Sequence, residues 1–329
     1  MKSLTPLRGV AALAVLLFHA GVPIRGYLAV DLFFMLSGFV LMHAYGDIDP
    51  RSGYGSFVKA RLARIYPVHL LMILFLLPFF GINERFSASA LVQNLLLVQG
   101  PWYAPAGPSV SWNDAAWSLS VEWHAYLLFP LVAPFIARQS ARTLRLIAIA
   151  CLVIVEGLEF HLGTIGIVAS PLVLVRGLPE FALGMILYRF FTDPAVRRHF
   201  ESDAVCLAVC AALIGAHLVS RNDALLLLLL PLLLFTCAAN DGRFASVLCG
   251  APLRFLGEIS FSLYMVQLVV RQYLYTVMPP GIPYELALVG ATFAIAIPIS
   301  RFVEYPARDW IKNPRWRQGA AKVALESPR

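Results

Sequence analysis

Long apolar runs, separated by short stretches that contain Pro, Gly and charged residues, recur along the whole chain of 329 residues. A helix needs about 20 largely apolar residues to cross a hydrocarbon core that is roughly 30 Å thick. The pattern therefore predicts an all-α, polytopic membrane protein with about ten transmembrane helices. The predicted spans are residues 4–22, 28–46, 64–81, 117–137, 143–161, 165–190, 203–220, 223–239, 253–278 and 284–303.

The remaining segments are short. Residues 88–100 are too few to cross comfortably, so we expect an interfacial or re-entrant piece there, followed by the loop at residues 101–116. No small-x-small cleavage site closes the first apolar run, which we interpret as a retained helix. We expect one transmembrane domain at residues 1–311 and a polar cytoplasmic tail at residues 312–329 that is too small to bury a core.

The composition agrees with this pattern. Hydrophobic residues make up 59% of the chain and charged residues 14%, whereas soluble domains have about 45–50% and about 25%. The five cysteines show neither C-x-x-C spacing nor a metal-ligand spacing with His, so we expect no disulfide framework and no metal site.

The net charge of +7 is explained by topology. Ten spans put both termini on one side, and a cytoplasmic assignment places 21 of the 26 Lys and Arg residues on that side. This asymmetry is what the positive-inside rule predicts. We therefore expect the lipid bilayer as a partner and no nucleic acid.

Ionisable residues inside spanning helices are candidate functional residues, because each is costly unless it is paired or faces water. Arg8 and His19 are eleven residues apart, which places them on one helix face about 16 Å apart along the axis. His19 has the side chain best suited to proton transfer near neutral pH. The alternatives are a snorkelling anchor for Arg8 and an interhelical hydrogen bond for His19.

Asp31 and Ser37 lie in the next apolar segment, after a very short connection. Because such a connection makes the first two helices antiparallel neighbours, Asp31 is expected to reach the face of His19. The alternative is a helix N-terminal acid that the helix dipole stabilises.

Further polar residues lie in the other spans. Arg61 and Arg64 share a helix face and suit a phosphate group, although positive-inside anchoring is an equally good explanation. Glu122, in the segment that begins at Trp117, is expected to face a cavity or a cation. Ser260 and Tyr264 share a face of a later helix.

One pair has a structural explanation that we favour. Arg176 and Glu180 are four residues apart in one helix, and this spacing allows them to pair with each other.

Several enzyme classes lack their motifs in this chain. We find no G-x-x-x-x-G-K-[ST], G-x-G-x-x-G, G-x-S-x-G or H-E-x-x-H. The sequence thus lacks the apparatus for ATP hydrolysis, dinucleotide chemistry and zinc hydrolysis.

Six segments, taken in order, resemble the integral-membrane acyltransferase family 3, which includes bacterial O-acetyltransferases of surface polysaccharides. The resemblance runs from Leu7 to Asp309, and the six together are specific although each is weak alone. The segments are LRGVAALAVLLFHA, GYLAVDLFFMLSGF, RLARIYP, WSLSVEWHAYLLFP, GEISFSLYMVQ and VEYPARDW.

The resemblance implies transfer of an acyl group, usually acetyl from acetyl-CoA, to a carbohydrate or other hydroxyl acceptor at the inner membrane. His19 matches the family's essential histidine, Arg8 the arginine before it, and Glu122 the acid of the W-S-L-x-x-E segment. Arg61 and Arg64 match the arginine pair linked to the donor. Gln267 stands where the family often has a histidine, and it cannot act as an acid near neutral pH.

These implications give a mechanistic hypothesis. His19 would be the general base, with Asp31 or Glu122 orienting its ring, while Arg8, Arg61 and Arg64 hold the phosphates of the donor. We further expect substrate contacts at four positions: Ser37, Trp117, Ser260 and Tyr264. No cofactor is expected to stay bound, because acetyl-CoA is a substrate, and the oligomeric state, including a homo-oligomer, stays open.

Two other classes compete with the enzyme. A proton-coupled transporter would also use intramembrane His, Asp and Glu residues, but it has no need of the arginines at the cytoplasmic side. A structural or sensory membrane protein explains none of the intramembrane charges. The loop aromatics Trp102, Tyr103 and Trp112 suit either sugar stacking or interfacial anchoring, and we favour anchoring.

Overall fold

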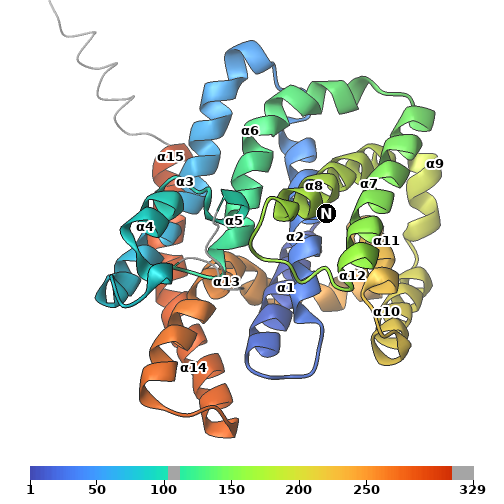
Figure 1. Ribbon diagram of the computed structural model, residues 1–329. Coiled ribbons are helices and arrows are strands. Elements are labelled where there is room, and N and C mark those ends of the chain that lie inside the picture. Colours follow the sequence, from blue (N-terminus) through green and yellow to red (C-terminus); the bar gives the residue numbers. More distant parts are fainter. Residues whose placement is uncertain (103–111, 313–329) are drawn as a thin grey trace, which may run out of the picture.

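The chain forms a helical bundle, and the computed structural model describes residues 1–102 and 112–312. Within these ranges the structure consists of helices and their connections, with no strand. The helices α1 and α2 lie near the centre of the bundle, with α3 and α4 on one side and α7, α10 and α11 on the other (Figure 1). The long helices of the first half are α1 (Leu4–His19), α2 (Ala29–Tyr45), α3 (Pro50–Leu76), α6 (Ala116–Arg138) and α7 (Ala141–Leu162).

The second half continues the bundle. Its long helices are α8 (Leu172–Phe191), α10 (Asp203–Val219), α11 (Ala224–Ala239), α13 (Ala251–Val277) and α14 (Ile282–Ile299). The short helices are α4 (Ala88–Leu95), α5 (Gln99–Trp102), α9 (Pro194–Arg197), α12 (Arg243–Leu248) and α15 (Tyr305–Lys312). Single tight turns occur at η1 (Gly26–Leu28), η2 (Leu77–Phe79), η3 (Glu84–Phe86) and η4 (Arg198–Phe200), and a π-helical turn at η5 (Ser300–Glu304).

Each of the ten predicted spans coincides with a helix, but helix length and hydropathy support fewer crossings. Among the described residues, five helices are long and apolar enough to span a membrane, or six if the bent pair Pro194–Phe200 and Asp203–Val219 counts as one. The apolar helices α1 and α11 have only 16 residues each. The helices α7 and α8 carry too many charges for the same test, because α8 alone contains Arg176, Glu180 and Arg189.

Two predicted boundaries are wrong for local reasons. The helix α3 begins at Pro50 rather than near residue 64, because the Asp49 carboxylate caps it by accepting a hydrogen bond from the backbone N–H of Arg51. Arg61 and Arg64 therefore lie inside one continuous helix. The helix α7 is capped by Gly163, whose φ of 71° is left-handed, and α8 begins only at Leu172, after Pro171, rather than near residue 165.

The segment at residues 88–100 is indeed too short to cross. It forms α4, which has eight residues, and the first turn of α5, and the chain breaks between them at Leu97 with a φ of 57°. Much of the loop that follows, and the tail at residues 313–329, lie outside the described residues.

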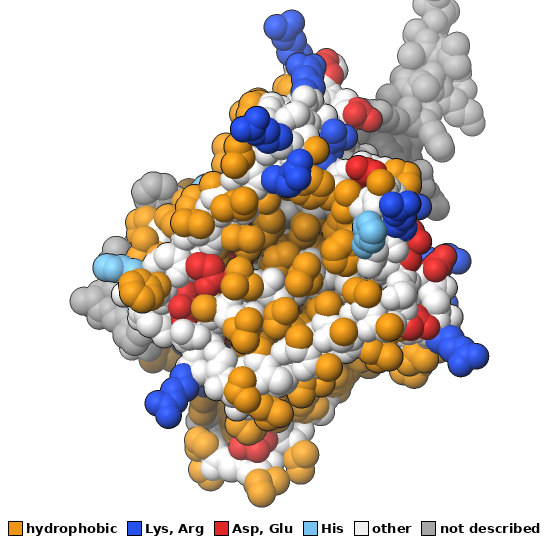
Figure 2. Space-filling model, turned by 90° about the vertical axis from the view of Figure 1, so that its right-hand side faces the viewer, with side chains coloured by type: hydrophobic (Ala, Val, Ile, Leu, Met, Phe, Trp, Pro, Cys, Tyr) orange, Lys and Arg blue, Asp and Glu red, His pale blue; other side chains and the backbone are white. Residues whose placement is uncertain are grey.

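The outer surface is strongly apolar. Figure 2 shows hydrophobic side chains over most of the centre of one face, with Lys and Arg side chains towards its periphery. Large hydrophobic side chains are freely exposed, among them Phe160 at 89%, Leu218 at 76% and Phe302 at 76%. Such a surface is unstable in water and stable in lipid, which agrees with a membrane protein.

Two helix pairs form the closest packing in the bundle. Helix α1 lies along α13 in the same direction, and a Cβ added at Gly257 would meet the carbonyl oxygen of Thr5 at 2.1 Å. Helix α2 lies along α8, where a Cβ at Gly184 would meet the carbonyl oxygen of Met35 at 2.0 Å. Small residues permit such close approach of backbones in membranes.

We predict that Gly257→Ala lowers stability by about 1–3 kcal/mol, because the added methyl group overlaps backbone atoms that cannot move aside. Thermal unfolding of the detergent-solubilised protein measures this loss. The matched control is Gly157→Ala in α7, where nothing lies within 4 Å of the added Cβ. Equal losses in the two variants would contradict the proposed role of the α1–α13 contact.

Candidate active site

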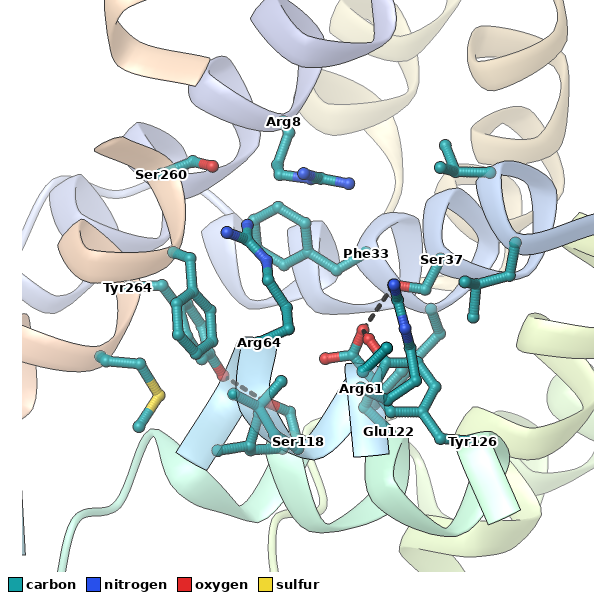
Figure 3. A pocket seen from close by; sticks show the side chains of 18 of the residues that line it. Arg8, Phe33, Ser37, Arg61, Arg64, Ser118, Glu122, Tyr126, Ser260 and Tyr264 are labelled. Atoms are coloured by element: carbon teal, nitrogen blue, oxygen red, sulfur yellow. Dashed lines mark hydrogen bonds between the residues drawn. The ribbon is translucent and has the colours of Figure 1, made fainter. Parts of the chain in front are cut away.

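A cavity of about 380 Å³ lies among α1, α2, α3, α6, α13 and α15 (Figure 3). Seven of the residues singled out in the sequence line it, together with several neighbours. The predicted residues that line it are Arg8, Ser37, Arg61, Arg64, Glu122, Ser260 and Tyr264. The further polar side chains in its lining are Tyr45, Ser118, Tyr126 and Arg308.

Arginines dominate the charge of this cavity, which we call the arginine cavity. Arg64 forms an ion pair with Glu304, whose other carboxylate oxygen accepts a hydrogen bond from Ser262 at 2.7 Å. Neither Arg8 nor Arg61 has an ion-pair partner among the described residues. Four arginines against Glu122 and Glu304 leave the cavity positively charged, which suits an anionic ligand.

Arg61 is held in place by aromatic rings. Its guanidinium lies 5.3 Å from the ring centre of Tyr45 and 5.7 Å from that of Phe57. Its Nε is buried and has no hydrogen-bond partner in the described part of the chain. An unpaired buried donor is costly, so this nitrogen indicates a place for an acceptor atom of a ligand.

Glu122 lies on the opposite wall from Arg8. Its Oε1 accepts hydrogen bonds from the hydroxyl of Ser37, at 2.6 Å, and from the hydroxyl of Tyr126, one turn along α6. These two donors compensate part of the cost of burying the carboxylate. Glu122 thus faces a polar cavity rather than lipid, as the sequence predicted.

The inner end of the cavity is closed by a hydrogen bond between α6 and α13. The hydroxyls of Ser118 and Tyr264 are 2.8 Å apart, and the ring of Phe33 packs edge-on against Tyr264 at 5.7 Å. Figure 3 shows both hydroxyls below Arg8 and Arg64. This contact forms a wall between the cavity and the next turn of α13.

His19 does not line the arginine cavity. It is the last residue of α1, about 16 Å along the helix axis from Arg8. Its Nδ1 lies 3.3 Å from Oε1 of Gln267, and Gln267 is three residues, or about 4.5 Å, beyond Tyr264 on α13. The histidine therefore lies just past the inner wall of the cavity.

Asp31 is not brought to His19. Both of its carboxylate oxygens accept hydrogen bonds from Arg176, at 2.7 and 2.8 Å, and both residues are almost fully buried. Arg176 also donates to the carbonyl of Ile167 and lies 5.0 Å from the ring centre of Trp117. Trp117 consequently supports this ion pair and is absent from the cavity lining, where we had expected a substrate contact.

The expected pairing of Arg176 with Glu180 is wrong. Arg176 binds Asp31 on α2, because the close approach of α2 and α8 offers a bidentate partner with better geometry than a residue of the same helix. Both carboxyl oxygens of Glu180 are buried and have no hydrogen-bond partner among the described residues.

Three contributors were missed in the sequence. Glu304 stands in the quoted segment VEYPARDW without a role, yet it is 3% exposed and forms an ion pair with Arg64. Glu304 is the last residue of the π-helical turn η5, and π turns are frequent at functional sites. Ser118 and Tyr126 stood in a quoted segment without a role, although their spacing of four from Glu122 placed them on its face.

The loop aromatics have different outcomes. The Trp112 side chain is fully buried, and its indole N–H donates to the carbonyl of Ser87 at 3.3 Å, so it acts neither as a sugar platform nor as an interfacial anchor. The side chain of Trp102 and all of Tyr103 lie outside the described residues.

Comparison with known proteins shows the family to which this chain belongs. The model of the Acyl_transf_3 family, an acyltransferase domain, matches residues 1–301. This chain belongs to the acyltransferase 3 family. Its members transfer acyl groups, so the protein is a membrane acyltransferase, and the transporter interpretation is not favoured.

Three curated relatives match this chain, and two of them are named as acyl- or acetyltransferases. The acyltransferase MdmB of Streptomyces mycarofaciens is 29% identical over 90% of this chain and 88% of its own length. Protein 2 in the picA locus of Rhizobium radiobacter is 37% identical over 34% of this chain and 72% of its own. A candidate peptidoglycan O-acetyltransferase, YrhL of Bacillus subtilis (strain 168), is 23% identical over 80% of this chain and 48% of its own. No solved structure matches this acyltransferase.

We predict that Asp31→Asn destabilises the acyltransferase by about 3–5 kcal/mol, because it leaves the Arg176 guanidinium buried without a counter-charge. The midpoint of thermal unfolding in detergent measures the change. Glu180→Gln is the control, since it replaces a carboxyl group of the same neighbourhood that has no ion-pair partner among the described residues. We expect its effect to stay within about 1 kcal/mol, and a larger loss than in Asp31→Asn would show that Glu180 carries the structural charge instead.

Proposed function

We propose that this acyltransferase moves an acyl group, acetyl in the first instance, from acyl-CoA to a hydroxyl of a carbohydrate or other glycan-type acceptor. The donor would enter the arginine cavity from the side where α1 begins, with its phosphates at Arg8, Arg61 and Arg64. His19, beyond the inner wall, would be the general base. The enzyme would act in the cytoplasmic (inner) membrane.

The observation that supports the donor best is the convergence of three arginines on one cavity, two of which, Arg8 and Arg61, have no ion-pair partner among the described residues. Arg8, Arg61 and Arg64 come from two helices that are distant in sequence, and they point into the same cavity (Figure 3). Phosphates are recognised by such donors through charge-assisted hydrogen bonds. The buried Nε of Arg61, which has no partner among the described residues, is satisfied if a phosphate oxygen accepts from it.

The distance from the arginines to His19 suits a long, flexible donor. Arg8 and His19 are about 16 Å apart along α1, a gap that an extended pantetheine arm can cover. To bring the thioester to His19, the arm must pass the wall formed by Ser118 and Tyr264. We propose that the hydrogen bond between these hydroxyls opens when the donor binds and that the freed hydroxyls then contact it.

The proposed reaction needs one base and one leaving group. His19 takes the proton from the acceptor hydroxyl as the oxygen attacks the thioester carbonyl carbon. The carbon–sulfur bond breaks as the tetrahedral intermediate collapses, and the coenzyme leaves as a thiolate. The imidazolium then gives its proton to that thiolate, so His19 returns to its neutral form.

The acceptor class rests on the family and on one relative's name. The Bacillus relative is named for peptidoglycan O-acetylation, and a glycan hydroxyl is a nucleophile that a neutral imidazole can activate. We therefore propose a glycan-type acceptor. It would approach His19 from the side opposite to the arginine cavity.

We also propose the ten-span topology with both termini in the cytoplasm. The helices α1 and α13 run in the same direction, as the first and ninth of ten spans must. The helices α2, α6 and α8 also share one direction, as the second, fourth and sixth must. Under this topology the arginine cavity opens towards the cytoplasm, where acyl-CoA is made.

We predict that Arg61→Ala raises the KM for acetyl-CoA at least about tenfold with a smaller effect on kcat, because it removes a charge-assisted contact to the donor. Release of free coenzyme with a mixed glycan acceptor is the assay. Arg64 is left in place, because its removal would also leave Glu304 unpaired. The matched control is Arg51→Ala, an exposed arginine of the same helix.

The same assay tests the base. We expect His19→Ala and His19→Gln to lower kcat by about 10²–10⁴ while acetyl-CoA binding persists. Full activity of His19→Gln would overturn the role of the histidine. If the wild type turns over another acyl donor but neither binds nor uses acetyl-CoA, the donor assignment is wrong.

We predict that an impermeant maleimide, applied to intact cells, labels Arg221→Cys but not Ser140→Cys, with the five native cysteines replaced. Both positions are exposed at opposite ends of the bundle in the proposed topology. Labelling of Ser140→Cys in intact cells would reverse the orientation. Labelling of both after the cells are permeabilised is the control for reactivity.

A further inference from the structure

Gln267 is the residue that contacts His19, and it lies in the interior of the bundle. Its side chain is wholly buried on α13, at the level where α1 ends. Its Oε1 lies 3.3 Å from Nδ1 of His19, and its Nε2 lies 3.2 Å from the carbonyl oxygen of Tyr264. Both ends of this amide therefore have a partner.

The second of these contacts fixes the orientation of the amide. A backbone carbonyl can only accept a hydrogen bond, so the group that faces Tyr264 must be the NH₂ end of the Gln267 side chain. The carbonyl end of the amide then faces His19 and can itself only accept. Consequently the imidazole nitrogen opposite to it must be the donor.

We propose that Gln267 is a positioning residue that holds His19 as the tautomer protonated on Nδ1. In neutral imidazole only one nitrogen carries the proton, so Nε2 keeps its lone pair. This nitrogen is the one that can take the proton of the acceptor hydroxyl. The inference rests on the proposed function only in naming His19 as the base; the tautomer itself follows from the two hydrogen bonds.

This role replaces the one that the sequence suggested for Asp31 and Glu122. Asp31 is engaged by Arg176, and Glu122 by Ser37 and Tyr126. An amide orients the ring as a carboxylate would, but it leaves no negative charge beside a histidine in an apolar interior. The charged group that acts on His19 from α13 is Arg271, one turn beyond Gln267.

The arrangement also links the base to the donor cavity. The backbone carbonyl of Tyr264 accepts a hydrogen bond from the Gln267 amide, and its side-chain hydroxyl forms the inner wall with Ser118. One turn of α13 thus positions both the wall and the orienting amide. A shift of this turn on donor binding would move His19 and the wall together.

Gln267→Met removes the acceptor with little change of volume, and Gln267→Glu keeps an acceptor oxygen at the same place. We expect Gln267→Met to lower kcat about tenfold with KM for acetyl-CoA unchanged, the loss of one buried hydrogen bond. Gln267→Glu should recover part of that loss. The control is Gln272→Met, the same change on the same helix at a site with no contact to His19. Equal kcat in Gln267→Met and wild type would overturn the proposal.

A spectroscopic readout separates this inference from the proposed function. In protein labelled with ¹⁵N-histidine, the His19 signals are identified as those missing from His19→Gln. We expect a protonated Nδ1 and an unprotonated Nε2 in the wild type, and a loss of this preference in Gln267→Met. A dominant Nε2–H tautomer in the wild type, or an unchanged spectrum in Gln267→Met, would refute the positioning role. This measurement needs no turnover, so it stands even if acetyl-CoA proves not to be the donor.

Discussion

The close packing of α1 along α13 is the contact on which the rest of the site depends. Gly9 and Gly257 let the two backbones approach in a way that no larger residue would permit. This approach places Arg8 opposite Ser260 and Tyr264 at one end, and His19 opposite Gln267 at the other. Because the helices run in the same direction, one interface sets both the arginine cavity and the histidine.

Buried charges occur in two arrangements in the bundle, one paired and one that leaves positive charge in excess. Between α2 and α8, Asp31 and Arg176 neutralise each other completely, with a bidentate contact and an aromatic ring beneath it. In the arginine cavity the positive charge is left in excess, because Glu304 pairs with Arg64 while Arg8 and Arg61 have no counter-ion among the described residues. Burial of an uncompensated charge is unfavourable unless water or a ligand supplies the missing partner. The first arrangement stabilises the fold, and the second is that of a binding site.

The wall between the cavity and the histidine sets the order of the proposed reaction. Ser118 and Tyr264 lie between the arginines and His19, and Gln267, the partner of His19, is about one turn beyond Tyr264 on α13. A closed wall would keep the base away from the donor until the thioester arrives. In the proposed scheme the acceptor meets His19 from the other side, so the two substrates would approach one catalytic group from opposite ends of the bundle.

The sequence by itself determined the all-helical architecture, the approximate place of each long helix, with the starts of α3 and α8 misplaced, and the family. Apolar runs of membrane length, interrupted by Pro, Gly and charge, leave few alternatives, because an unpaired backbone is not tolerated in lipid. It also singled out Arg8, Arg61, Arg64 and Glu122 as functional candidates, and the structure shows that all four line one cavity. Spacing along a helix determines which side chains share a face, so the periodicity of each helix predicted the face on which these residues lie.

Only the tertiary structure decided which partners those side chains have. In the structure Asp31 pairs with Arg176 rather than with His19. Arg64 pairs with Glu304, and His19 contacts Gln267. Each of these pairs joins residues more than 140 positions apart. Helix periodicity shows which way a side chain points but not which helix lies opposite, because neighbours in a bundle are chosen by packing between distant segments. The partners of the charged groups, and hence their chemistry, are therefore a property of the packed bundle.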